Sequence, residues 1–206
     1  MAIDRSKVIE QMSKVSVEAN PDGLIPAFNV LINAFPADFW NTFTYKMVDA
    51  VNEDIKDAVE ELFVNAAHEC GYHTGYGIIT SKEWDAIVKP MVENTEDVLH
   101  GAYAVFTAWG WGKAEIVELT PGEKMVVKVE DYYESDIKDH FSGAKADRMM
   151  AYMIRGVSGA FMDLAYGGDY DPAGESGLYT FACEQTKGIE TGDSYGEFVV
   201  QKRNDA

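Results

Sequence analysis

The strongest constraint on the fold is a change of hydrophobic period about half-way along the chain. From Glu53 to Cys70, apolar residues recur at the spacing of an amphipathic helix. From Ala102 to Tyr133, β-branched and aromatic residues dominate, and the turn sequence TPGE divides this part. We therefore expect antiparallel strands across residues 102–133. A helical half followed by strands predicts an α+β fold, with its helices segregated from a mostly antiparallel sheet.

The remaining segments fit the same arrangement. Further helical patterns cover residues 6–18, 37–51, 82–90 and 145–168, and two closing strands cover residues 177–185 and 195–202. Ser81 is placed to cap the third of these helices, and residues 21–36 read as a loop-rich connector with three prolines. The chain shows no internal repeat and no linker. We expect a single domain over residues 1–206, in which residues 1–54 form a helical N-terminal extension.

Composition excludes several classes of protein. The chain has 206 residues and a net charge of −18, from 35 acidic against 17 basic residues, so binding of nucleic acid through phosphate neutralisation is not expected. No apolar run approaches the roughly 20 residues of a membrane helix, and the N-terminal stretch MAIDRSKVIEQ lacks the apolar core that a signal peptide would have. We expect no membrane association and a cytoplasmic location, where Cys70 and Cys183 stay free thiols.

The stretch AHECGYHTGYG, residues 67–77, holds two of the four histidines and one of the two cysteines. On a helix, Cys70 continues the apolar stripe of Leu62 and Ala66 and is expected to face the core. His68 lies roughly 200° round the helix from Cys70. His68 and His73 are five residues apart, whereas two chelating histidines on one helix prefer a spacing of four. The three residues therefore lack the geometry of a single-helix metal site.

Small residues in the same stretch favour a packing role. Ala67, Gly71 and Gly75 follow each other at a spacing of four, which permits close contact with another element. Two alternatives stay open for this stretch: the lining of a ligand pocket, and a metal site completed by distant residues such as His100 or Cys183.

Aromatic residues are concentrated in the middle of the chain. His100 precedes a set made up of Tyr103, Phe106, Trp109, Trp111, Tyr132 and Tyr133. Such a set can form either an ordinary aromatic core or an apolar cavity with a few polar groups, as a small hydrophobic ligand requires. A dinucleotide fingerprint, a P-loop and a nucleophile elbow are all missing from the sequence. Binding is therefore favoured over catalysis.

Several short motifs, in order, resemble a known family. The last third carries YMIRGVSGAFMDLAYG, a strand that reaches Cys183, then KG, GD and YGEFVV. In these it resembles the 4-vinyl reductase domain, also called the hydrocarbon-binding domain. The middle carries GYHTGYG, VLHGAYAV and VEDYYESD, and here it is similar to the sensory version of that domain in phenol- and toluene-responsive bacterial activators. The resemblance covers roughly residues 55–201.

The resemblance implies an α+β fold like that of the Golgi tethering subunits and the haem nitric-oxide sensors, in which a helical N-terminal half packs on a mostly antiparallel sheet. It also implies a homodimer and a buried pocket for an aromatic or hydrocarbon-like ligand. The His and Trp that hold the ligand hydroxyl in the phenol sensors correspond to His100 and Tyr132. We expect Phe106, Trp111 and Phe161 to form walls of the pocket.

The same resemblance bears on metal. The phenol sensors hold a zinc ion with three cysteines and a glutamate; here Cys183 is retained, while Ala151, Thr180 and Gly196 occupy the other places. Since structural zinc requires four ligands, we predict no tightly bound zinc and no other cofactor.

Three functions follow in order of preference. The first is a stand-alone protein, acting as sensor, carrier or subunit, that binds a small apolar molecule. The second is an enzyme for an aromatic or tetrapyrrole-like substrate in the same pocket. The third is a haem or metal sensor that uses His68, His73, His100 or His140.

Overall fold

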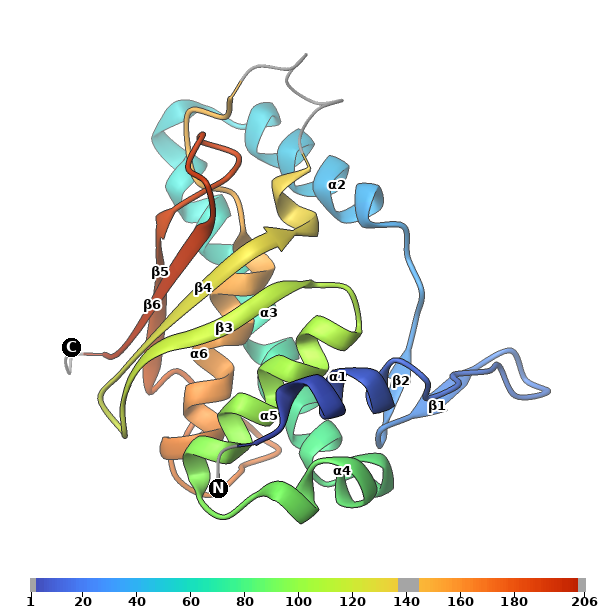
Figure 1. Cartoon of the computed structure of the whole chain (residues 1–206). Coiled ribbons are helices and arrows are strands. Elements are labelled where there is room, and N and C mark those ends of the chain that lie inside the picture. The colour runs from blue at the N-terminus through green and yellow to red at the C-terminus, as the bar shows by residue number, and fades with distance from the viewer. Residues whose placement is uncertain (1–2, 137–144, 204–206) are drawn as a thin grey trace.

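The computed structural model of the chain describes residues 3–136 and 145–203 (Figure 1). Its α-helices are α1 (Arg5–Met12), α2 (Ala37–Ala50), α3 (Lys56–Ile79), α4 (Lys82–Ile87), α5 (Thr95–Ala108) and α6 (Tyr152–Tyr166). Its strands are β1 (Ile25–Ala27), β2 (Val30–Ile32), β3 (Gly112–Thr120), β4 (Lys124–Tyr132), β5 (Phe181–Lys187) and β6 (Gly196–Lys202). Short 3₁₀ turns include η3 (Tyr133–Ser135).

A four-stranded antiparallel sheet with the order β3-β4-β6-β5 forms one layer of the molecule. Helices α5 and α6 lie against one face of this sheet, and α3 lies against α6 (Figure 1). Along β5, the alternating residues Phe181, Cys183 and Gln185 are buried, as expected for a strand with one covered face. The main hydrophobic core lies between the sheet and the two covering helices. The predicted α+β class is confirmed.

Small residues set the distance between α3 and α6. A Cβ atom on Gly156 of α6 would lie 2.4 Å from the carbonyl oxygen of Val64 and 2.5 Å from the Cβ of Ala67. On the other helix, a Cβ on Gly71 would lie 3.0 Å from the Cβ of Ala160. Only glycine allows two helix backbones to approach this closely. The packing role predicted for Ala67, Gly71 and Gly75 is confirmed.

The same close packing corrects the expected orientation of α3. Leu62 is 65% exposed, and Ala66 and Cys70 are exposed as well. His68, in contrast, is buried. The expectation that Cys70 faces the core is therefore wrong. The helix turns its glycine-bearing side inwards because that side can reach α6. Leu62, Ala66 and Cys70 are left outside, while Phe63 and Val64 are buried.

The expected strands begin later in the chain than residue 102. The segment 102–108 belongs to helix α5, whereas the expected strands form over residues 112–120 and 124–132. Asn94 caps this helix, with its side-chain oxygen accepting a hydrogen bond from the Asp97 N–H at 2.9 Å. Leu99, Tyr103 and Phe106 then share its buried side. Burial of that side outweighs the β propensity of the individual residues.

The N-terminal part mixes helices with a hairpin. The expected helices are present as α1 and α2, but strands β1 and β2 pair within the presumed connector. Phe28 and Asn29, between the two strands, have φ values of 54° and 59°. This is the left-handed conformation of a two-residue hairpin turn, which normally carries glycine or asparagine. Residues 1–54 thus carry the two expected helices and, in the expected connector, a short hairpin that the sequence analysis did not predict. Within the described residues, no helix has both the length and the hydropathy needed to cross a membrane.

Candidate functional site

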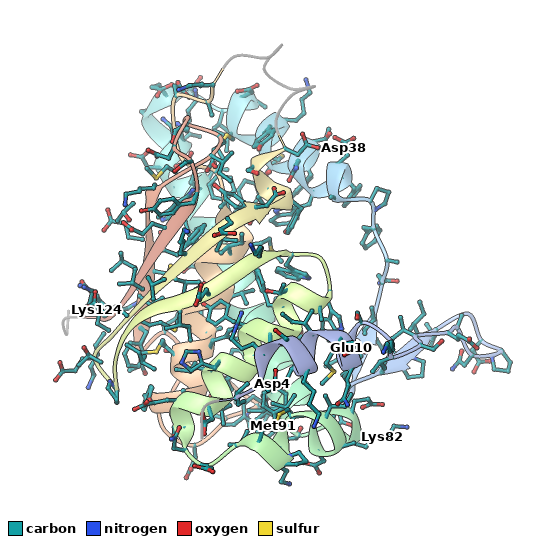
Figure 2. All side chains as sticks on the ribbon, viewed as in Figure 1. Asp4, Glu10, Asp38, Lys82, Met91 and Lys124 are labelled. Atoms are coloured by element: carbon teal, nitrogen blue, oxygen red, sulfur yellow. The ribbon has the colours of Figure 1, made fainter. Side chains whose placement is uncertain are left out.

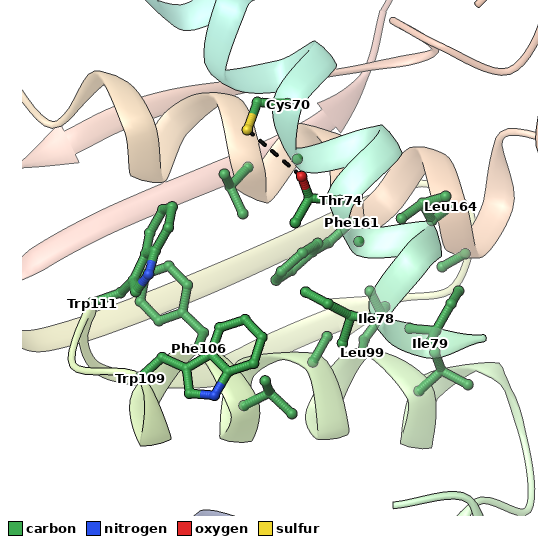
Figure 3. Close-up of a pocket in the computed structure, with 17 residues that line it drawn as sticks. Cys70, Thr74, Ile78, Ile79, Leu99, Phe106, Trp109, Trp111, Phe161 and Leu164 are labelled. Atoms are coloured by element: carbon green, nitrogen blue, oxygen red, sulfur yellow. Dashed lines mark hydrogen bonds between the residues drawn. The ribbon is translucent and has the colours of Figure 1, made fainter. Parts of the chain in front are cut away.

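An apolar cavity of about 100 Å³ lies between helices α3, α5 and α6, partly open to the outside (Figure 3). Figure 3 shows Phe106, Trp109 and Trp111 grouped at one end of the cavity and Ile79 and Leu164 at the other. The three helices come from segments that are far apart in the sequence. The cavity therefore depends on the tertiary packing described above.

Helix α3 contributes a wall built partly from glycine. Gly71, Thr74, Gly75 and Ile78 line the cavity on this side. A Cβ atom on Gly75 would lie 2.7 Å from Cδ1 of Leu164, so a larger residue here would push into the lining of α6. The alternative that this stretch lines a ligand pocket therefore agrees with the structure.

Aromatic rings form much of the rest of the wall. The centroids of Phe106 and Trp111 lie 5.3 Å apart at an interplanar angle of 51°. Phe161 meets the ring of buried Tyr103 edge-on at 5.3 Å, and Trp109 meets Phe28 of the N-terminal hairpin at 4.7 Å. Each of these rings therefore has an aromatic neighbour that restricts its movement. The wall is therefore preorganised for an aromatic or hydrocarbon surface.

Few polar groups face this space. Among the lining residues, Thr74 and Cys70 carry a hydroxyl and a thiol, and Trp109 and Trp111 carry indole N–H groups. The Sγ atom of Cys70 lies 3.8 Å from Oγ1 of Thr74 (dashed line in Figure 3). Cys70 is the only lining residue with a titratable thiol or acid, and no acid–base pair faces the cavity. The surface of the cavity is almost entirely apolar, so the arrangement can shelter an apolar molecule but offers it little hydrogen bonding.

The structure brings together three of the five predicted ligand-binding residues. Phe106, Trp111 and Phe161 line the cavity, as expected for its walls. His100 and Tyr132 are not among the lining residues. The expectation that these two residues point into the cavity is therefore not met, and each has an identifiable physical reason.

His100 points away because its segment is helical. The lining residues of α5 include Ala102 and Phe106, and His100 lies roughly on the opposite side of a helix with 3.6 residues per turn. The backbone oxygen of His100 accepts a hydrogen bond from Arg5 at 2.9 Å. Burial of the imidazole and, secondarily, the charge of Arg5 lower the pKa of His100.

Tyr132 is engaged elsewhere, at the end of β4. Its hydroxyl donates to the carboxylate of Glu190 and accepts from the Ile189 N–H at 3.0 Å. The Glu190 carboxylate also accepts from the Met150 N–H at 3.0 Å and from Nε2 of Gln185 at 2.8 Å. This network fixes the loop before α6 to the turn between β5 and β6. Tyr132 thus belongs to a buried hydrogen-bond network that is separate from the cavity.

A second buried carboxylate was missed by the sequence analysis. Glu134 accepts hydrogen bonds from the N–H groups of Met153 and Ile154, at 2.9 and 3.0 Å, and from Nε1 of Trp40 at 3.0 Å. It therefore caps the N-terminus of α6 from another part of the chain. Burial raises the pKa of Glu134 to about 7, against the opposing effect of these donors. The sequence held no signal for this role, because the capping side chain lies about twenty positions before the helix.

The histidines of the 67–77 stretch have separate partners. Nε2 of buried His68 lies 2.6 Å from Oδ2 of Asp163, and Asp163 also accepts from the N–H groups of Tyr179 and Phe181. Nδ1 of His73 lies 2.9 Å from the hydroxyl of Tyr170. His68 therefore belongs to a link between α3, α6 and the start of β5.

Possible metal ligands are not gathered in the part of the chain that the structure describes, where no three His, Cys, Asp or Glu side chains are placed to share an ion. Burial raises the pKa of Cys183 to about 12, which keeps its thiol protonated. His140 lies outside the described residues. The expectation of no zinc and no other cofactor stays a prediction.

Known structures share this architecture, although no protein-family model matches the sequence and no curated protein matches it significantly. The phenol-responsive sensory domain of the transcription activator PoxR, crystallised with phenol, superposes with a TM-score of 0.70 at 11% identity, over 98% of this chain and 92% of that one. The chain has the fold of this sensory domain. The shared part therefore extends beyond residues 55–201 into the N-terminal segment.

Two further structures were found. Subunit 3 of a trafficking protein particle complex from Naegleria fowleri, covalently bound to palmitic acid, matches with a TM-score of 0.55 at 13% identity, over 82% of this chain and 93% of that one. A vinyl-4-reductase family protein from Methanocaldococcus jannaschii matches with a TM-score of 0.42 at 12% identity, over 84% of this chain and 85% of that one. The sensory domain and the trafficking subunit, with TM-scores of 0.70 and 0.55, confirm the fold expected from the resemblance.

Proposed function

We propose that the protein binds a small apolar molecule, the size of one aromatic ring, in the cavity between α3, α5 and α6. The observation that carries this proposal is the cavity itself: about 100 Å³, walled by aromatic and aliphatic side chains, and free of charged groups. An unfilled apolar space of this kind costs stability, and a ligand that fills it recovers the lost contacts.

The volume favours a single ring over a long chain. A cavity of about 150 Å³ lined by apolar side chains is known to stay dry and to bind benzene. The space here, about 100 Å³ with one open side, is of the same order. A long acyl chain would have to widen it or extend outwards. Phenol in the PoxR sensory domain supports the smaller ligand, and palmitic acid on the trafficking subunit supports an apolar one in general.

Energetics set the expected affinity. Burial of about 200 Å² of apolar surface yields roughly 5 kcal/mol at 25 cal/mol per Å², and van der Waals contacts with preorganised rings add to this. Association itself costs several kcal/mol. Because these two contributions largely cancel, a bare ring such as toluene is expected to bind weakly, at millimolar concentration or above. A better-matched natural ligand would bind more tightly.

The cavity supports binding over catalysis. Its lining holds no acid–base pair, so a reaction would require groups from outside it. A sensor, carrier or subunit role, as a homodimer, completes the proposal. The acidic surface, with a net charge of −18, disfavours a nucleic-acid partner.

Ligand-observed NMR with toluene and phenol tests the proposal at millimolar concentration. Wild-type protein should show saturable binding of both. Ala102→Leu, which adds three carbons to a lining residue, should weaken binding at least tenfold. The matched change Ala182→Leu, on strand β5 and outside the cavity, should leave binding unchanged. If both variants are folded and Ala102→Leu binds toluene and phenol as tightly as the wild type does, the cavity is not the binding site.

A further inference from the structure

Two spaces of the molecule approach each other at the turn of the N-terminal hairpin. The first is the apolar cavity between α3, α5 and α6, with Trp109 among its lining residues. The second is an open groove of about 440 Å³, lined by residues 26–31 and by Lys82 and Glu83 of α4. Figure 1 shows the hairpin beside α1 and α4, and Figure 2 shows Lys82 at the surface on this side. The turn residue Phe28 lines the groove and is not among the residues that line the cavity.

The rings of Phe28 and Trp109 form the partition between the two spaces. Their centroids lie 4.7 Å apart at an interplanar angle of 63°, so the rings are in edge contact. Phe28 is 1% exposed and belongs to a hydrophobic cluster with residues of α1, α4 and α5. That cluster includes Val105, which also lines the cavity. Removal of the Phe28 ring would therefore leave apolar space beside Trp109, on the side of the groove.

The backbone of Phe28 has a conformation that a bulky residue rarely adopts. Its φ of 54° lies in the left-handed region, where glycine and asparagine are most readily accommodated. Glycine followed by asparagine would form the same two-residue turn without this strain. A strained residue persists where its surroundings hold it in place, and such residues gather at functional sites. The side chain of Phe28 therefore has a role that the turn itself does not require.

The hairpin has attachments that do not use the Phe28 ring. Nδ2 of Asn29 donates to the carbonyl oxygen of Thr80 at 3.0 Å. A Cβ atom on Gly77 of α3 would lie 2.6 Å from Cγ1 of Val30, so the hairpin packs directly on that helix. Loss of the ring therefore removes the partition, while these attachments keep the turn in place.

We infer that Phe28 is a positioning residue that sets the upper size limit of the ligand, because its ring holds Trp109 in the cavity wall and closes the cavity towards the groove. The inference rests on the proposed function and narrows the ligand class to single-ring hydrocarbons with short substituents. A longer alkyl chain has no room in a cavity of about 100 Å³ and gains nothing by extending into water. With glycine at position 28, the chain can occupy the apolar space that the ring leaves.

Titration of toluene and n-propylbenzene tests the inference, with the ratio of their dissociation constants as the readout. Wild-type protein should bind propylbenzene no more tightly than toluene. Phe28→Gly should bind propylbenzene about tenfold more tightly than toluene, since burial of two additional methylene groups is enough for such a change. Leu24→Gly is the matched control: Leu24 is 50% exposed, directly precedes the hairpin and lines neither space. Its ratio should equal that of the wild type.

A purely structural role for Phe28 predicts a different result, because a less stable protein would bind both ligands more weakly and keep the wild-type ratio. Phe28→Leu, which retains an apolar side chain in the cluster, is the second variant if Phe28→Gly does not fold. Its ratio should lie between those of the wild type and Phe28→Gly. Toluene binding by the wild type, together with a wild-type ratio in a folded Phe28 variant, would overturn this inference alone. Wild-type protein that binds neither ligand would overturn the proposed function as well.

Discussion

Substitution of Gly156 by alanine probes the packing that creates the cavity. The new methyl group would lie 2.4 Å from the carbonyl oxygen of Val64 and 2.5 Å from the Cβ of Ala67. Both belong to the rigid backbone region of α3, so neither can rotate away. Overpacking of this kind costs about 1–3 kcal/mol, and the backbone contact places the cost at the upper end or above it. The gain in helix propensity returns about 1 kcal/mol.

The expected net loss for Gly156→Ala is about 2–3 kcal/mol in the free energy of unfolding. For a chain of this size the loss corresponds to a fall of roughly 5–10 °C in the melting temperature. Gly71→Ala is the milder control, because a Cβ atom there would lie 3.0 Å from its nearest neighbours. The gain in helix propensity and the cost of overpacking should nearly cancel, so its free energy of unfolding should stay close to that of the wild type. Urea unfolding of the three proteins gives the comparison. If Gly156→Ala were as stable as the wild type, the close α3–α6 contact described above would be wrong.

Three further predictions concern single side chains. The pKa of Glu134 is raised from 4.5 to about 7, so between these pH values the folded state holds a proton that the unfolded state releases. The free energy of unfolding should therefore fall by about 3 kcal/mol as the pH rises from 4.5 to 7. Urea midpoints that stay level across this window, or that shift in the same way in Glu134→Gln, would argue against this prediction. Cys70 is exposed and Cys183 buried, so the native protein should show one reactive thiol, and saturating toluene should slow its alkylation; two thiols of equal rate would contradict this placement. Thr74→Val, which keeps the size of this lining residue, should leave the binding of toluene and of phenol nearly unchanged, because almost none of the cavity surface is polar; a selective loss of phenol binding would show that the Thr74 hydroxyl reaches the ligand.

Helix and strand content was largely predictable, because it rests on local pattern. The spacing of Ala67, Gly71 and Gly75 correctly indicated close packing, since glycine at regular helical positions has few other uses. The side of α3 that faces inwards was not predictable. That choice depends on Gly156 of a helix some ninety residues later, and the helical spacing of Leu62, Ala66 and Cys70 suggested a different side.

The sequence allowed the aromatic walls of the cavity to be predicted, but the two polar residues expected in it, His100 and Tyr132, were misplaced. Phe106, Trp111 and Phe161 were expected as walls together with the resemblance, and these large aromatic side chains do line the space between helices α3, α5 and α6. His100 was misplaced because residues 102–108 read as a strand, which changes the direction of every side chain near them. Tyr132 was misplaced because its partner, Glu190, is 58 residues away and carries no local signature.

Crystals of the wild-type protein exposed to xenon or soaked in toluene test the central claim most directly. Xenon occupies apolar cavities of this size without needing a polar contact. The account predicts one dominant site bounded by Phe106, Trp111 and Phe161. An empty cavity at high xenon pressure, together with occupancy elsewhere in the core, would contradict the proposal that this space binds ligand.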